Sequence, residues 1–441
     1  MRFIFSAPFR TNINLKTVNA VDSSDLIYDV LYQAKQDIEG NVPETLSWDI
    51  PWNKSNNGEL QYAALTEDSL PLSATPILKL NISNYQCANA LIANFAFESL
   101  TINSCFVEYY DNTIAILTID MVFNGIKNTK LFLENVDEWS TAYCSSAIKY
   151  IKPFETSMLF AIAKYDGLNK KQIFLKAGNF TVFFDRNSLE NNAYIDREEM
   201  LWVTRLLLQE QTHIDIELLK TWTQQAELDS MKQQIGSACV AFCTGNSVVF
   251  NTMDNAEDRA LKVSLSISMY FYVLYDLLNK NLRLMFLNIS RTKKVPTFII
   301  TNVNQTRSHI EFIENEFSDV LMGLQGVRSR FCKILLDTWN YPDLVGAVQK
   351  KKESVGKTVA FILEEKSSRY RRIIESILAT VGGIAILDFS LSLFTFASNA
   401  KISKDSIPGL IDSTKYLSVD GTLYTIVLFL CLVFFFIIKK R

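Results

Sequence analysis

The stretch that decides the fold is residues 373–398, which read IIESILATVGGIAILDFSLSLFTFAS. Its only ionisable residues are Glu375, near its start, and Asp388. A helix rises ~1.5 Å per residue, so this run reaches ~39 Å, more than the ~30 Å hydrocarbon core of a bilayer. The sequence therefore predicts that residues 373–398 cross a membrane as one helix with some tilt.

A second apolar run, residues 421–438, contains no charged residue. As a helix it would reach ~27 Å, which is just enough to cross the hydrocarbon core. It is apolar on every side and lies next to a basic tail, residues 439–441, which favours a membrane span over a buried core helix. We therefore expect a hairpin of two membrane helices joined by an external loop, residues 399–420.

Basic residues set the orientation that we expect for this hairpin. They flank it on both sides, whereas loop 399–420 balances three lysines against three aspartates. Because cytosolic flanks carry an excess of Lys and Arg, both ends are expected in the cytosol and the loop outside. Residues 1–10 contain no apolar run of signal-peptide length, so an inner-membrane protein with cytosolic N- and C-termini is predicted. The flanking residues form the basic collar: Arg369, Arg371, Arg372, Lys439, Lys440 and Arg441.

The wider segment 350–372 holds eight basic residues against three glutamates. Such a segment suits anionic lipid headgroups or a ring of positive charge around a cytosolic vestibule. An ordinary solvated helix face would have the same composition.

Asp388 is the most informative residue of the first span. A carboxylate near mid-membrane costs about 2.5–3.5 kcal/mol on insertion scales, so it should face a partner or water. Ser392, Thr395 and Asn399 follow at steps of four, three and four, which places all four residues on one helix face. In a symmetric oligomer this face would line a pore that favours cations. The alternative is a polar face that joins helices, with Asp388 protonated.

The part in front of the membrane segment is predicted to be an α+β cytosolic domain with long stalk helices. Residues 1–195 form its α/β portion, with strands at 2–7, 76–82, 101–109, 113–123, 172–176 and 180–184. A helix is expected over 130–151, with Pro153 marking its end. Residues 196–304 are expected to be mostly helical, with helices over 196–229 and 254–287 and a strand pair within 238–251.

Residues 305–372 carry the most regular pattern in the chain. Apolar residues recur at steps of three and four, which is a heptad seam: Ile310, Ile313, Phe317, Val320, Leu324, Val327, Phe331 and Ile334. The seam predicts a long stalk helix leading into the first span, with a local break at 339–342 caused by Pro342. An intramolecular helical hairpin would produce the same seam, but its continuation into the span favours self-association.

Several classes of function lack support in the sequence. The formal net charge of −3 at pH 7 argues against direct nucleic-acid binding, which usually needs a basic domain. The seven cysteines show no zinc-ligand spacing, so free thiols are expected. No phosphate-binding loop, nucleophile elbow or HExxH motif occurs, and His213 and His309 lie in unrelated contexts. We expect no enzyme.

The order of elements resembles the CorA family of divalent-cation channels. The shared plan is an α/β cytosolic domain, long helices, a very long helix that becomes the pore-lining span, a second span and a basic tail like Lys439–Arg441. The resemblance implies a homopentamer, with a divalent cation as the bound or conducted ion. The family's Gly-Met-Asn motif is absent, since Ala397 and Ser398 precede Asn399.

The absence of the Gly-Met-Asn motif indicates which branch of the family the chain resembles. Motif-free CorA-like proteins stand beside type III CRISPR systems, where they are thought to act as membrane effectors that respond to a nucleotide second messenger. A large soluble domain and a changed filter fit that group.

Three hypotheses follow for function. The first is a CorA-like homo-oligomeric channel or pore, gated by a ligand such as a small nucleotide that the cytosolic domain senses, with a role in antiviral defence. The second is a divalent-cation transporter of the magnesium type. The third is a non-conducting oligomeric scaffold tethered to the lipid bilayer. The ligand-binding and metal-binding residues are not identified by the sequence.

Overall fold

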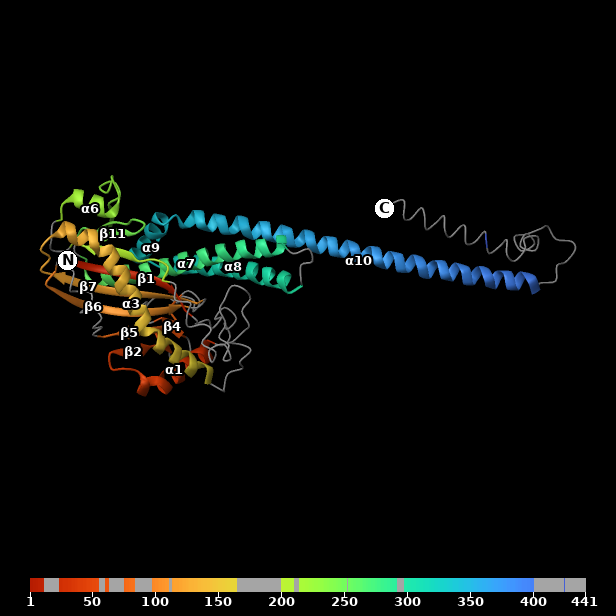
Figure 1. The fold of residues 1–441 in the computed structure, drawn as a ribbon, viewed down its shortest axis with the longest axis horizontal. Helices are drawn as coiled ribbons and strands as arrows, with labels where there is room; N and C mark the ends of the chain where they lie inside the picture. Colours follow the sequence, from red (N-terminus) through yellow and green to blue (C-terminus); the bar gives the residue numbers. More distant parts are fainter. Residues whose placement is uncertain are drawn as a thin grey trace. The chain divides into compact units, whose positions relative to one another are not determined.

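The computed structural model describes residues 1–11, 24–54, 60–62, 75–83, 97–110, 113–164, 200–209, 214–251, 253–291, 297–399 and 424. They belong to two units, Met1–Gly356 and Lys357–Arg441. The described residues form a mixed α+β protein, as expected (Figure 1). Its helices are α1 (Ser24–Ile38), the 3-10 turn η3 (Glu39–Asn41), α3 (Thr129–Lys164), α6 (Ile216–Thr223), α7 (Asn255–Arg291), α8 (Thr297–Gly323), α9 (Gly326–Thr338) and α10 (Tyr341–Asn399).

Nine strands of the described residues form one sheet in the order β2-β5-β6-β7-β1-β8-β11-β10-β9. Neighbouring strands are antiparallel except β8 and β11, which are parallel. The strands are β1 (Arg2–Arg10), β2 (Leu46–Asp49), β5 (Leu78–Ile82), β6 (Ser99–Tyr110), β7 (Ile114–Asn124), β8 (Thr204–Leu208), β9 (Gln233–Ile235), β10 (Ala238–Ala241) and β11 (Asn246–Val249). A separate pair is made by β3 (Trp52–Lys54) and β4 (Leu60–Tyr62).

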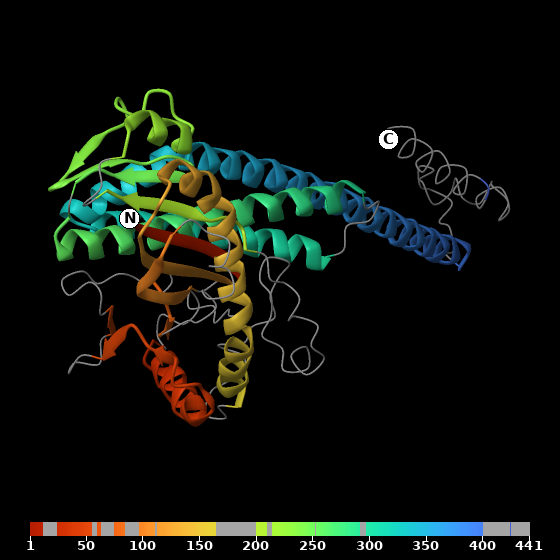
Figure 2. The same cartoon turned by 60° about the vertical axis from the view of Figure 1, so that its left-hand side comes forward.

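Side chains of the central strands alternate between two buried faces, as the period of two along a strand requires. Phe3, Phe5 and Phe9 of β1 belong to the core cluster on the face that α3 covers, together with Trp139 and Tyr143 of α3 (Figure 2). The even-numbered residues of β1 and β7 point to the opposite face, which α7 covers. Burial on both faces explains why β1 and β7 are apolar nearly throughout.

The end predicted for the helix over 130–151 is wrong, because α3 continues through Pro153 to Lys164. A proline inside a helix removes one hydrogen bond and costs about 3 kcal/mol. Here Pro153 lies on the exposed side, while Ile151 and Met158 on the other side are fully buried. The burial of that helix side beyond Pro153 outweighs the cost of the proline. This burial depends on tertiary contacts, which the sequence alone does not show.

Residues 196–304 contribute more to the sheet than expected. The predicted helix over 196–229 is wrong: β8 pairs with β1 on one side and β11 on the other, and among the described residues of that stretch only α6 is an α-helix. Pairing with two strands overrides the local helix preference of this segment. The predicted strand pair is confirmed as β10 and β11, and the helix over 254–287 as α7. Predicted strands 2–7, 76–82, 101–109 and 113–123 correspond to β1, β5, β6 and β7, whereas 172–176 and 180–184 lie outside the described residues.

Much of the heptad seam is buried within the protein's own fold, and self-association along it stays a prediction. Ile310, Val320 and Phe331 are buried against neighbouring helices, and the ring of Phe317 lies 4.6 Å from that of Phe271 on α7. The helices α7 and α8 run side by side (Figures 1 and 2), as in the alternative of an intramolecular hairpin.

The predicted stalk over 305–372 is not one helix. It is interrupted between α8 and α9, where Gln325 is extended and Gly326 has a positive φ of 61°. The second interruption was predicted: α9 ends at Thr338, Asn340 adopts a left-handed conformation, and α10 begins at Tyr341. Pro342 then occupies the first turn of α10, where its missing N–H costs nothing.

Burial of the seam yields a test by substitution. Ile310→Ala should destabilise the fold by about 2–5 kcal/mol, because it leaves a cavity under α8. Met322→Ala on the same helix should change stability by less than about 0.5 kcal/mol, since Met322 is 73% exposed. Thermal unfolding of the detergent-solubilised chain measures both. A dissociated but equally stable I310A variant would contradict the intramolecular role of the seam.

Candidate functional site

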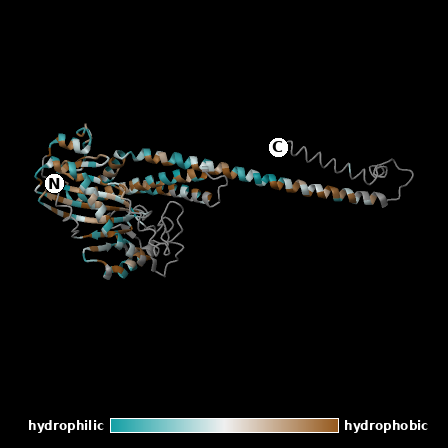
Figure 3. Cartoon of the chain, in the orientation of Figure 1, coloured by the Kyte–Doolittle hydropathy of each residue, from teal (hydrophilic) through white to brown (hydrophobic). Residues whose placement is uncertain are grey.

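Two described helices are long and apolar enough to cross a membrane, namely α7 and α10. Their environments differ. The apolar window of α7 is mostly buried inside the protein, whereas none of the window of α10 is buried. Figure 3 shows the apolar character of the later part of α10, where these large side chains are exposed: Ile373, Ile374, Ile377, Leu378, Val381, Ile384, Ile386, Phe389, Leu391 and Phe396. A soluble surface rarely leaves so many apolar side chains uncovered.

The predicted polar face lies on this helix. Asp388, Ser392 and Thr395 are exposed residues of α10, and Asn399 is its last residue. The helical backbone therefore brings the four positions onto one face, as expected from their spacing. The hydroxyl of Thr395 donates to the carbonyl oxygen of Leu391 at 2.8 Å, which satisfies it along the helix.

The described part of the basic collar is exposed and partly paired along its own helix. Arg369 pairs with Glu365, and Arg371 Nε lies 3.0 Å from a Glu375 oxygen. Exposed pairs four residues apart contribute only about 0.3–0.5 kcal/mol each, so these charges stay available to lipid or ions. Arg372 is exposed too. Residues 400–420, the second span apart from Tyr424, and Lys439, Lys440 and Arg441 lie outside the described residues.

Two lysines at the start of segment 350–372 do not face solvent as a headgroup-binding segment would. Lys351 Nζ donates to Asn279 Oδ1 on α7 at 2.5 Å. Lys352 Nζ lies 3.6 Å from a Glu311 oxygen and 3.8 Å from a Glu314 oxygen, both on α8. These contacts tie the first turns of α10 to α7 and α8.

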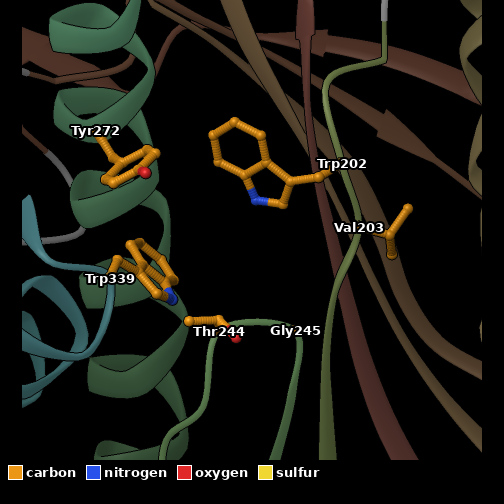
Figure 4. A pocket seen from close by; sticks show the side chains of 6 residues that line it. All are labelled: Trp202, Val203, Thr244, Gly245, Tyr272 and Trp339. Carbon is orange, nitrogen blue, oxygen red and sulfur yellow. The ribbon is translucent and has the colours of Figure 1, made fainter.

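A pocket of about 260 Å³ lies in the Met1–Gly356 unit, and sequence reasoning missed it (Figure 4). Its walls come from four places in the fold: the approach to β8, the turn between β10 and β11, α7, and the connection between α9 and α10. The lining residues are Trp202, Val203, Thr244, Gly245, Tyr272 and Trp339. Three aromatic residues about 70 positions apart share no local pattern, so only the tertiary fold brings them together.

The lining residues that the structure describes carry no formal charge. Tyr272 is the titratable residue among them, and its pKa is raised by burial and by the nearby Asp276 carboxylate, against an opposing effect of Lys280. The Asp276 and Lys280 side chains pair at 2.7 Å. The phenol is therefore neutral at physiological pH, and the described walls offer aromatic faces, the hydroxyls of Thr244 and Tyr272, and backbone groups.

A ring of four charges connects the sheet to α7, and it too was not expected. Arg2 of β1 pairs with Asp120 of β7 and with Asp258 of α7, each at 2.7 Å. Lys262 of α7 completes the ring, at 2.6 Å from Asp120 and 3.0 Å from Asp258. Asn103 donates to Asp120 at 3.1 Å from an irregular point in β6. Burial opposes ionisation of Asp120, but its bonds to Arg2 and Lys262 prevail and lower its pKa.

Among the described residues, no group of three His, Cys, Asp or Glu side chains is placed to hold a metal ion. Comparison of the chain with protein-family models, curated proteins and solved structures finds no match. The resemblance to CorA proteins consequently remains an expectation that rests on the order of elements and on the residues quoted for it.

Asp120 generates a pH-dependent prediction. Its folded pKa is lowered, so its contribution is present above the unfolded pKa of about 4 and is lost as the pH falls through the folded value. Asp120→Asn should cost about 3 kcal/mol at pH 7, and the difference from the wild type should narrow below about pH 4. Denaturant unfolding at several pH values measures this difference. The exposed pair partner Glu217, changed to Gln, should show little effect at any pH. A D120N deficit that stays constant down to pH 2 would contradict the assignment.

Proposed function

We propose that the chain is a membrane-anchored, homo-oligomeric ion channel or pore of the CorA-like type, gated by a ligand that its α+β domain senses. The observation that supports this most directly is α10. It starts at Tyr341 among the packed helices and extends as one helix to Asn399, where its large apolar side chains are exposed. Lipid is the environment in which such a helix is stable.

The polar face of α10 supports conduction. Asp388 has no hydrogen-bond or ion-pair partner among the residues that the structure describes, and it lies within the apolar stretch. A lone carboxylate facing lipid is costly, whereas a ring of them around a water-filled axis is solvated and attracts cations. Since most of the seam at Ile310–Ile334 is buried within the chain, assembly would rest mainly on the membrane helices; the family resemblance implies five copies.

Coupling between a ligand and α10 is supported by the packing around its first turn. The ring of Tyr341 lies 5.2 Å from that of Tyr275 on α7 and 5.0 Å from that of Phe317 on α8. Trp339, two residues earlier, lines the pocket. A ligand that favours one arrangement of this connection would bias the direction of α10, which is the differential binding that gating requires.

The nature of the response follows the resemblance. A nucleotide-activated pore that dissipates ion gradients would serve antiviral defence, and a gene neighbourhood containing type III CRISPR components would support that role. Magnesium uptake that rescues a transport-deficient strain would instead favour the transporter.

Ion flux through proteoliposomes tests the pore. Asp388→Asn should lower cation flux several-fold and weaken selectivity for cations over anions, because it removes the ring of charge. Ser392→Ala should also change conductance, since Ser392 shares that face. Ser390→Ala is the matched control: Ser390 lies two residues away on the opposite side of the helix and bonds the Ile386 carbonyl. Equal flux from all variants would refute a pore lined by Asp388, and no flux under any condition would favour a scaffold.

A further inference from the structure

The ring of Tyr272 meets both tryptophan rings of the pocket nearly at right angles. Tyr272 and Trp339 lie on one side of the pocket, and Trp202 lies on the other (Figure 4). The ring centroid of Tyr272 lies 5.6 Å from that of Trp202, with an interplanar angle of 88°, and 5.9 Å from that of Trp339, with an angle of 75°. Rings in this edge-to-face arrangement hold one another in place without help from a ligand.

Perpendicular walls favour a compact guest over a flat one. A planar ring can stack on one wall but then presents its edge to the neighbouring wall, whereas a rounded group contacts all of them. The faces of aromatic rings carry negative electrostatic potential, so converging faces attract a cation within about 6 Å of their centroids. Trp and Tyr are the strongest side chains for this interaction.

The described lining residues bear no formal charge, which narrows the kind of cation that they can bind. A strongly hydrated ion such as Na⁺ or a primary ammonium would lose its water without gaining a carboxylate. Asp276, one turn along α7 from Tyr272, is already paired with Lys280. A methylated ammonium group keeps its charge, is weakly hydrated and needs no hydrogen-bond acceptor. A volume of about 260 Å³ suits such a group with a short tail.

We propose that Trp202, Tyr272 and Trp339 form an aromatic cage that binds a small molecule bearing a methylated ammonium group. Binding in the cage is independent of whether the protein conducts. That the same compound opens the pore rests on the proposed function, through the position of Trp339 at the connection into α10; the gating ligand of this pocket would then be a methylated ammonium compound and not a nucleotide.

The experiment compares a cation with its uncharged isostere. Choline and 3,3-dimethylbutan-1-ol have nearly the same shape, but only choline is charged. Titrations of the detergent-solubilised full chain, followed by tryptophan fluorescence and calorimetry, should show choline binding roughly tenfold more tightly than the alcohol. Tetramethylammonium should compete with choline for the same site. Equal affinities for choline and the alcohol would overturn the cage, as would the absence of choline binding at tens of millimolar.

Variants locate the site. Tyr272→Leu and Trp202→Leu should each weaken choline binding about tenfold or more, whereas Tyr272→Phe should retain most of it because the ring remains. Tyr32→Leu is the control, since Tyr32 is an exposed tyrosine of α1 that does not line the pocket. Thermal unfolding confirms that each variant is folded. Binding that persists in both Leu variants would refute the assignment.

Two further outcomes separate binding from gating. Adenosine serves as a flat aromatic probe, and its binding to the cage without displacement by choline would indicate a stacking site and overturn the proposal. If choline binds as expected but leaves proteoliposome flux unchanged, the cage stands and its role as the gating site fails.

Discussion

The packing of α7 against the sheet is the constraint on which the rest of the structure depends. On one side the ring of Tyr270 stacks on Tyr110 of β6 at 4.5 Å, and the four-charge ring fixes the helix start to β1 and β7. On the other side Phe271 contacts Phe317 of α8. Residues 264–275 of α7 are buried apart from the half-buried Tyr272, and away from the sheet α8, α9 and the first turn of α10 provide the cover.

Two helices of similar apolarity therefore have different environments. Both α7 and α10 pass a membrane test by length and composition, but only α7 is enclosed by protein. The two helices differ in the charged residues of their apolar stretches. Lys262, Asp276 and Lys280 interrupt α7, whereas residues 376–398 of α10 contain a single charged residue, Asp388. In the structure Lys262 pairs with Asp120 and Asp258, as a mostly buried charge requires. Asp276 pairs with Lys280, whose side chain is exposed.

How much of the fold could be predicted depends on where the controlling interaction lies. Strands β1, β5, β6 and β7, helix α7 and the break before α10 follow from local periodicity and Pro342, and they were predicted. Contacts between distant segments decide three other features: the continuation of α3 through Pro153, the formation of strand β8, and which helix covers the heptad seam. The seam shows the limit well: steps of three and four specify that Ile310 is buried, but not by which helix. Gly323 and Gly326 are typical of a helix break such as the one between α8 and α9. The apolar spacing continues across them without a gap, and for that reason one helix was predicted.

The candidate sites divide in the same way. The polar face of α10 is a property of one helix, so its spacing could be read from sequence, whereas the aromatic pocket requires four segments to meet. In the proposed channel, this division bears on gating. A pore face that belongs to one helix can be reoriented as a unit, and a pocket built from several elements responds to any change in their arrangement. Trp339 belongs to the pocket and lies two residues before the start of α10, so in the proposed channel a rearrangement of the pocket walls would reach this helix through two residues of backbone. The buried rings of Tyr275 and Tyr341, 5.2 Å apart, pack the first turn of α10 against α7, and closely packed side chains transmit a shift that loose loops would absorb.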